Sequence, residues 1–125
     1  MTKTFTLTAA AILMAAAGLA AAQSAPATAK GDALVGPNDM TLYTFDKDTA
    51  GNGKSVCNGG CATNWPPLMA RADDKVSGDW SIITRDDGSK QWAYKGKPLY
   101  FWAKDAKPGE RNGDGINQVW HTAKP

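Results

Sequence analysis

The chain has 125 residues, with 14 lysines and arginines, 12 aspartates and glutamates, and two cysteines. The near balance of charge argues against a nucleic-acid-binding protein, because such proteins carry clustered basic residues. The length is enough for one small domain with a thin hydrophobic core. The one long apolar stretch, residues 7–22, is too short and too weakly hydrophobic to span a membrane convincingly, so we expect no transmembrane segment.

Residues 1–22 have the features of a secretory signal peptide. Lys3 supplies the positive charge, an alanine-rich apolar run follows, and Ala20 to Ala22 offer a cleavage site before Gln23. A retained N-terminal helix is the alternative. Cleavage removes only one charged residue, which leaves 13 basic and 12 acidic side chains and a net charge of +1. No cysteine lies near the site, so we expect no lipid anchor and predict a periplasmic or secreted protein.

The rest of the chain predicts a flexible leader over residues 23–33 and a single β-rich domain over residues 34–125. The leader is rich in alanine, serine, threonine and proline. Beyond it, short β-rich runs alternate with turn-forming residues, and no segment has a sustained helical period. We therefore predict an all-β fold, a small antiparallel-sheet domain with little helix beyond one turn near residues 62–65. Predicted strands lie at residues 40–45, 80–84, 91–94, 98–102 and 119–122, after a short apolar run at residues 33–35.

A seven-residue pattern occurs twice in the predicted domain. Residues 42–48 read Leu-Tyr-Thr-Phe-Asp-Lys-Asp, and residues 99–105 read Leu-Tyr-Phe-Trp-Ala-Lys-Asp. One further tryptophan follows each copy, Trp65 after the first and Trp120 after the second. Shared spacings of this kind indicate an internal duplication. The two predicted repeats cover about residues 34–70 and 91–125.

The residues of the repeated motif allow two interpretations. In an extended strand, the tyrosine and the second aromatic residue share one face, and the leucine lies on the other. In the structural interpretation the rings pack with their counterparts, and each aspartate accepts backbone N–H bonds from the loop that follows it. In the functional interpretation, two pseudo-equivalent Tyr/Asp pairs flank a shared binding site. The residues concerned are Tyr43, Phe45, Asp48, Tyr100, Trp102 and Asp105.

Cys57 and Cys61 are expected to form a disulfide, because an exported domain meets an oxidising compartment. So short a closure gains little from chain entropy, and its use is to hold the shape of the loop. Three residues separate the cysteines, so the spacing fits neither a thioredoxin-type redox pair nor a zinc knuckle. A redox or metal role is the alternative interpretation.

Other patterns that carry chemistry are weak. Glu110, Asn112 and Asp114 imitate the opening of an EF-hand loop, but His121 stands where the closing glutamate should be. An irregular calcium site is therefore an alternative rather than the prediction. The chain has neither a Gly-x-Ser-x-Gly motif nor a phosphate-binding Gly-x-x-x-x-Gly-Lys motif. We predict no catalytic residues, no metal site and no cofactor, and hence a protein that is not an enzyme.

Five tryptophans in so short a chain fit a core that draws most of its apolar area from large aromatic side chains. Several tryptophans exposed on one face would instead form a stacking platform for a sugar ring. We predict an exported cell-envelope protein, a non-enzymatic binding or structural module whose partner is an envelope protein or a small ligand. The alternatives are a periplasmic accessory to redox, metal or haem handling and a sugar-binding module.

The combined motifs resemble those of a known bacterial family. Leu-Tyr-x-Phe-x-x-Asp, Cys-x-x-x-Cys, Asn-Trp-Pro-Pro-Leu, Tyr-Lys-Gly-Lys-Pro-Leu-Tyr-x-Trp-x-x-Asp and Pro-Gly-x-x-x-Gly-x-Gly follow one another in this order. Over about residues 34–125 the chain is similar to the predicted secreted lipoproteins with a Tyr-x-(Phe/Trp/Tyr)-x-x-Asp motif, also described as a secreted repeat of unknown function. The resemblance implies that the six residues named above are the motif positions. It implies an exported location and no particular activity, and the cysteine that would carry a lipid is missing from this chain.

Overall fold

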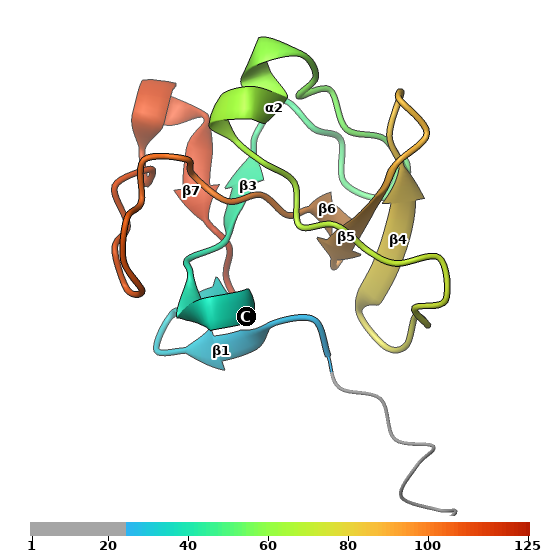
Figure 1. The fold of residues 1–125 in the computed structure, drawn as a ribbon, viewed down its shortest axis with the longest axis horizontal. Coiled ribbons are helices and arrows are strands. Elements are labelled where there is room, and N and C mark those ends of the chain that lie inside the picture. The colour runs from blue at the N-terminus through green and yellow to red at the C-terminus, as the bar shows by residue number, and fades with distance from the viewer. Residues whose placement is uncertain (1–24) are drawn as a thin grey trace, which may run out of the picture.

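Short strands joined by turns make up most of the fold, which a computed structural model describes over residues 25–125. The predicted signal peptide at residues 1–22 lies outside the described residues. In chain order the elements are β1 (Thr28–Lys30), β2 (Ala33–Val35), the 3-10 turn η2 (Pro37–Asp39), β3 (Tyr43–Phe45), α2 (Gly60–Asn64), β4 (Trp80–Thr84), β5 (Lys90–Tyr94), β6 (Lys97–Pro98), the 3-10 turn η3 (Ile116–Gln118) and β7 (Trp120–Thr122). Figure 1 shows β3 beside β7, the β4–β5–β6 sheet on the opposite side of the molecule, and α2 at one end.

The strands form three small antiparallel sheets, which confirms the predicted all-β class with little helix. β1 pairs with β2, β3 pairs with β7, and β4, β5 and β6 form a three-stranded sheet. The turn between β4 and β5 is the predicted Asp-Gly hairpin. Asp87 accepts the backbone N–H of Ser89 at 2.9 Å, and Gly88 adopts a φ of 88°, which favours glycine. No helix within residues 25–125 is long and apolar enough to cross a membrane.

The two repeats interlock, because the last segment of each pairs with the first strands of the other. β7 belongs to the second repeat and pairs with β3 of the first. Residues 66–69 end the first repeat and form bridges to the second. The backbone hydrogen bonds are equivalent on the two sides: Ala123 N donates to Leu42 O at 2.8 Å, and Leu68 N donates to Leu99 O at 2.9 Å. Each repeat therefore depends on the other for part of its strand pairing.

Tyr43 and Tyr100 mark the centre of this pseudo-twofold arrangement. The two residues occupy the same position in the two motif copies and form an isolated antiparallel bridge with each other. Tyr43 N donates to Tyr100 O at 2.8 Å, and Tyr100 N donates to Tyr43 O at 3.0 Å. The two copies of the motif thus meet backbone to backbone in the interior.

Alternation along the motif divides the interior into two cores, as the period of two in a strand requires. Leu42 and Leu99 are fully buried in one core, and Tyr43 and Tyr100 are fully buried in the other. The predicted division of the motif between two faces is therefore confirmed. The leucine core comprises Ala27, Leu34, Leu42, Leu68, Trp92, Leu99 and Ala123, and the aromatic core comprises Tyr43, Cys57, Trp65, Tyr100 and Trp120.

The folded part begins earlier than predicted, because β1 lies within the leader assigned to residues 23–33. Ala27 is buried in the leucine core, and β1 pairs with β2 in the register Thr28–Val35 to Lys30–Ala33. Every side chain of β1 is exposed, so the strand has no apolar alternation by which its sequence could indicate it.

The strand predicted over residues 98–102 is also wrong in its extent. Only β6 and an isolated bridge at Tyr100 are present there, since successive residues bond to different segments. Leu99 N donates to Trp92 O, whereas Phe101 N donates to Pro66 O. This change of partner follows from the interlocking of the repeats.

Candidate functional site

The tyrosine and aspartate of the repeated motif pair across the two repeats. The Tyr43 hydroxyl donates to Asp105 Oδ2 at 2.5 Å, and the Tyr100 hydroxyl donates to Asp48 Oδ2 at 2.6 Å. Both phenols are fully buried, Asp105 is buried and Asp48 is half-buried. Hydrogen bonds to a charged acceptor in a poorly solvated interior are among the stronger ones in proteins. Each pair therefore joins one repeat to the other.

The second oxygen of each carboxylate holds the loop that follows its own motif copy. Asp48 Oδ1 accepts the backbone N–H of Val56 at 2.8 Å, and Asp105 Oδ1 accepts that of Asn112 at 3.0 Å. The structural interpretation of the motif predicts this use of the two carboxylates.

The phenol oxygens have further partners that complete their hydrogen bonding. Gly113 N donates to the Tyr43 hydroxyl at 3.2 Å, and the Ser55 hydroxyl lies 2.6 Å from that of Tyr100. Burial raises the pKa of both phenols far above the usual range, and the neighbouring carboxylates raise it further. Burial also raises the pKa of Asp48 above its usual value. Within residues 25–125 no buried side-chain nitrogen or oxygen lacks a partner.

Four aromatic rings stack into a column that also alternates between the repeats. Phe45 stacks on Trp120 at 4.1 Å between ring centroids, Trp120 on Trp65 at 3.7 Å, and Trp65 on Trp102 at 4.0 Å. The Trp65 and Trp120 planes differ by only 2°. The two central rings are buried, whereas Phe45 and Trp102 at the ends are half-buried. We call this set the aromatic column.

An open cleft of about 390 Å³ lies against one side of the aromatic column, between α2 and η3. Rings of the column form its apolar wall, while polar side chains from α2, η3 and the end of β3 stand around it. We call it the column cleft. Its principal lining residues are Phe45, Trp65 and Trp120 in the wall, with Lys47, Cys61, Asn64 and Asn117 around them.

The predicted disulfide is confirmed, with Cys57 and Cys61 joined at 2.06 Å between the sulfurs. Cys57 has no exposed surface and belongs to the aromatic core. Cys61 is half-buried in the first turn of α2 and lines the column cleft. The two cysteines of the bridge therefore differ in their exposure to solvent.

A buried arginine connects the disulfide loop to the motif. Arg85 is only 4% exposed, and its Nη1 donates to Ser55 Oγ at 3.0 Å and to Gln91 Oε1 at 2.7 Å. Its Nη2 donates to the carbonyl oxygen of Cys57, and Ser55 in turn meets the hydroxyl of Tyr100. Among the described residues, no carboxylate forms an ion pair with this guanidinium.

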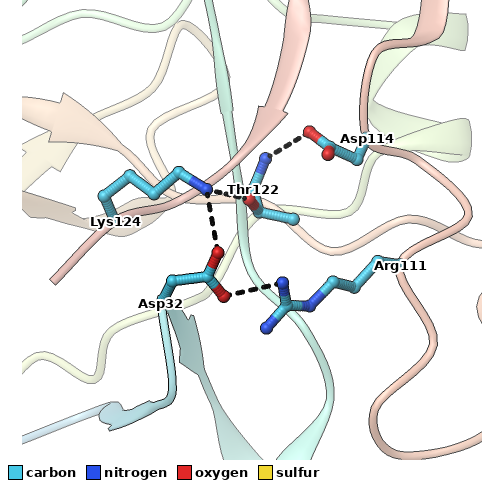
Figure 2. A network of polar contacts seen from close by, with 5 residues as sticks. All are labelled: Asp32, Arg111, Asp114, Thr122 and Lys124. Atoms are coloured by element: carbon cyan, nitrogen blue, oxygen red, sulfur yellow. Dashed lines mark hydrogen bonds and ion pairs between the residues drawn. The ribbon is translucent and has the colours of Figure 1, made fainter.

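The acidic loop that imitates an EF-hand opening makes its contacts with the protein itself. Asp114 Oδ1 accepts the backbone N–H of Thr122 at 3.1 Å. Figure 2 shows this bond near Asp32, which pairs with Arg111 at 2.8 Å and with Lys124 at 4.0 Å. The Arg111 guanidinium lowers the pKa of Asp32 below its usual value. In the part of the chain that the structure describes, no three His, Cys, Asp or Glu side chains form a group that could hold a metal ion.

Sequence reasoning singled out the six motif residues but missed three that complete their surroundings, namely Ser55, Arg85 and Gly113. A Cβ at Gly113 would stand 2.8 Å from Trp65 and 3.0 Å from Tyr43, so the rings leave room only for glycine. Ser55 and Gly113 each contact the hydroxyl of a motif tyrosine. They lie in loops whose sequences differ between the repeats, so the sequence does not indicate this shared role. Arg85 follows a strand and precedes a turn, a place where a charged side chain is usually exposed.

Comparison of the chain with known proteins also finds two repeats. A family model described as a secreted repeat of unknown function matches residues 25–69 and again residues 81–124. No curated protein and no solved structure matches the chain. The two matches cover more than half of the sequence and agree with the family that its motifs suggest. The chain therefore belongs to the family of secreted repeats of unknown function.

Proposed function

We propose that this secreted protein is a non-enzymatic binding module of the cell envelope, periplasmic where the cell has a periplasm, which holds a partner protein at the column cleft. The observation that carries the proposal is the opening of the aromatic column to solvent at a site ringed by polar side chains. At about 390 Å³ the cleft has the size to take one or two side chains of a partner.

The state of the motif residues supports a binding role over a catalytic one. Tyr43 and Tyr100 are fully buried and engaged with carboxylates of the opposite repeat. A general acid or base must reach the proton that it transfers. The two hydroxyls instead face the motif carboxylates in the interior. The motif supports a stable scaffold, and the surface that the scaffold presents carries the function.

The chemistry of the column cleft favours a particular kind of partner. The faces of Trp65 and Trp120 are covered by stacking, so their edges are left to meet a ligand, and ring edges carry the positive part of the aromatic quadrupole. Lys47 adds an ammonium group, and Asn64 and Asn117 add amide donors. A peptide segment with an apolar side chain next to an acidic one complements this surface.

Site-specific photocrosslinking in exporting cells tests the proposal. A photoreactive phenylalanine at Asn117 is expected to give an adduct of defined additional mass, whereas the same residue at the exposed Asp73 gives none. Lys47→Glu should weaken the Asn117 adduct, because it reverses the charge that meets the acidic group. Equal labelling from both positions, or no adduct at Asn117, would contradict the proposal.

A sugar-binding module is the second candidate, at a different place. A cleft of about 650 Å³ is lined by Trp80, Trp92 and Tyr94, and two of these rings, Trp80 and Tyr94, are half-buried with centroids 4.7 Å apart. Titration with cell-wall oligosaccharides should then change the tryptophan fluorescence, and Trp80→Phe should abolish the change while Trp102→Phe leaves it intact. A titration without any fluorescence change would count against this candidate.

A further inference from the structure

We propose that the Cys57–Cys61 disulfide is a thiol–disulfide exchange site that accepts two electrons from an exported dithiol protein, with Cys61 as the sulfur that is attacked. The chemistry resides in the disulfide and its surroundings. The site shares the column cleft with the partner binding proposed above, but exchange with a thiol does not require that binding, so either proposal can fail without the other.

The pseudo-twofold arrangement places a residue without a disulfide where Cys61 lies in the first repeat. Trp65 and Trp120 occupy equivalent places, and four residues before each lie Cys61 and Ile116. Both of these side chains pack on the aromatic core, from α2 in one repeat and from η3 in the other. The second repeat builds its turn with Ile116 and no disulfide. A bridge over so short a loop also gains little from chain entropy.

Access to the disulfide is one-sided. Cys57 is fully buried, whereas Cys61 is half-buried and lines the open column cleft. Exchange requires a thiolate to approach one sulfur in line with the S–S bond, so the sulfur of the more exposed residue, Cys61, is the one attacked and that of Cys57 leaves. Lys47 lines the same cleft, and its ammonium group attracts an incoming thiolate.

The leaving sulfur belongs to a residue that a buried cation already contacts. Arg85 is 4% exposed, donates to the carbonyl of Cys57, and has no carboxylate at ion-pair distance among residues 25–125. A neighbouring positive charge stabilises a thiolate and makes it a better leaving group. Arg85 thus serves as a positioning residue that favours the reduced form.

The exchange proceeds in two displacements. A thiolate of the donor attacks Cys61 Sγ, a bond forms between these two sulfurs, the Cys57–Cys61 bond breaks, and Cys57 leaves as a thiolate. The second thiol of the donor loses its proton and attacks the donor sulfur of the mixed disulfide, which releases Cys61 as a thiolate. The donor ends as a disulfide, oxidised by two electrons. The two cysteines end reduced and take up the two protons that the donor thiols release.

Glutathione serves as the test reagent, with the full exported chain in its folded state. In redox buffers of reduced and oxidised glutathione, followed by alkylation and intact mass measurement, we expect reduction of the bridge at a rate that does not change with low concentrations of urea. In Cys57→Ser, oxidised glutathione should form a mixed disulfide on Cys61. In Cys61→Ser, the buried Cys57 should react at least about tenfold more slowly.

Substitution of Arg85 separates an electrostatic role from a purely structural one. Arg85→Gln should shift the equilibrium with glutathione toward the disulfide by about tenfold, and Arg85→Lys should restore it, because only the positive charge matters to the thiolate. Near-UV circular dichroism checks that each variant is folded. The two single-cysteine variants test the proposal even where Arg85→Gln does not fold. Reduction only at the rate of global unfolding, or equal reactivity of the two cysteines, would show a structural brace and overturn the proposal.

Discussion

Tyr43 and Asp105 belong to different repeats, yet the hydrogen bond between them measures 2.5 Å, and Tyr100 and Asp48 repeat the arrangement in the opposite sense. Each motif copy supplies the donor of one pair and the acceptor of the other. A single copy therefore leaves both its phenol and its carboxylate without their partners. This explains physically why the motif contains both residue types at a fixed spacing: the spacing sets the position of each group relative to the other repeat.

Double-mutant cycles should detect this crossed pairing. For Tyr43→Phe combined with Asp105→Asn, we expect a coupling free energy of about 1 kcal/mol or more, because the two groups share a buried hydrogen bond. The matched control combines Tyr43→Phe with Asp48→Asn, two residues of the same copy, and should give a coupling near zero. Urea unfolding monitored by tryptophan fluorescence supplies the free energies. Equal coupling in the two cycles would contradict a crossed pairing.

The raised pKa values of the two phenols predict a loss of stability in alkaline solution. Burial keeps Tyr43 and Tyr100 protonated in the folded protein above pH 10, where tyrosines in the unfolded chain release their protons. The unfolded state then binds fewer protons than the folded state, so the free energy of unfolding falls by about 1.4 kcal/mol per pH unit for each tyrosine. Below pH 10 this contribution to stability is fully present.

Urea unfolding between pH 8 and pH 11.5 measures this alkaline effect. The double variant Tyr43→Phe/Tyr100→Phe is the control, since it removes both phenols but keeps every lysine. Above pH 10 the wild-type curve should fall more steeply than that of the variant, with a difference that approaches about 2.7 kcal/mol per pH unit. Parallel curves would mean that the phenols ionise equally in the two states.

Two glycines provide a matched test of the aromatic core. A Cβ at Gly113 would meet Trp65 at 2.8 Å, and a ring held in the aromatic column cannot move aside easily, so Gly113→Ala should destabilise the protein by about 1–3 kcal/mol. A Cβ at Gly60, in α2, would have no atom within 4 Å, so Gly60→Ala should be neutral or slightly stabilising. Thermal unfolding of both variants measures the difference. A similar Tm for the two would contradict the close packing at Gly113.

The sequence predicted what local patterns determine and missed what depends on the other repeat. The Asp-Gly hairpin before Ser89, the disulfide of Cys57 with Cys61, and the division of the motif between two faces all follow from short-range rules, and all three are present. The crossing of the Tyr/Asp pairs depends on which segments lie side by side. The spacing of tyrosine and aspartate within a motif copy is the same whether the two residues pair within that copy or with the other copy.

Burial of a polar side chain likewise cannot be predicted from the local sequence pattern. Arg85 has the sequence context of a surface residue, but the loop that carries Ser55 and Cys57 packs on it from far away in the sequence. β1 is the converse case, an element with no buried side chain that the pairing with β2 alone defines. For Arg85 a distant segment decides the outcome, whereas for β1 it is the backbone pairing with the next strand, β2, and not the side chains of β1.

The interlocking of the repeats predicts that neither half folds alone. A protease site placed in the exposed connection at residues 71–79 allows the chain to be cut between the repeats. The cut protein should stay associated, because β7 pairs with β3 and the aromatic column takes Phe45 and Trp65 from one piece and Trp102 and Trp120 from the other. The disulfide lies within the first piece and cannot tether the two.

Separation in denaturant and recombination complete this experiment. Each isolated piece should lack near-UV circular dichroism, since each retains only two rings of the column and only one strand of the β3–β7 sheet. Mixing equal amounts should restore the signal with a dependence on concentration, as an association requires. A folded-state signal from either piece alone would mean that a repeat can close on itself, and the crossed Tyr/Asp pairs would then be a consequence of joining two complete units, not the condition for folding.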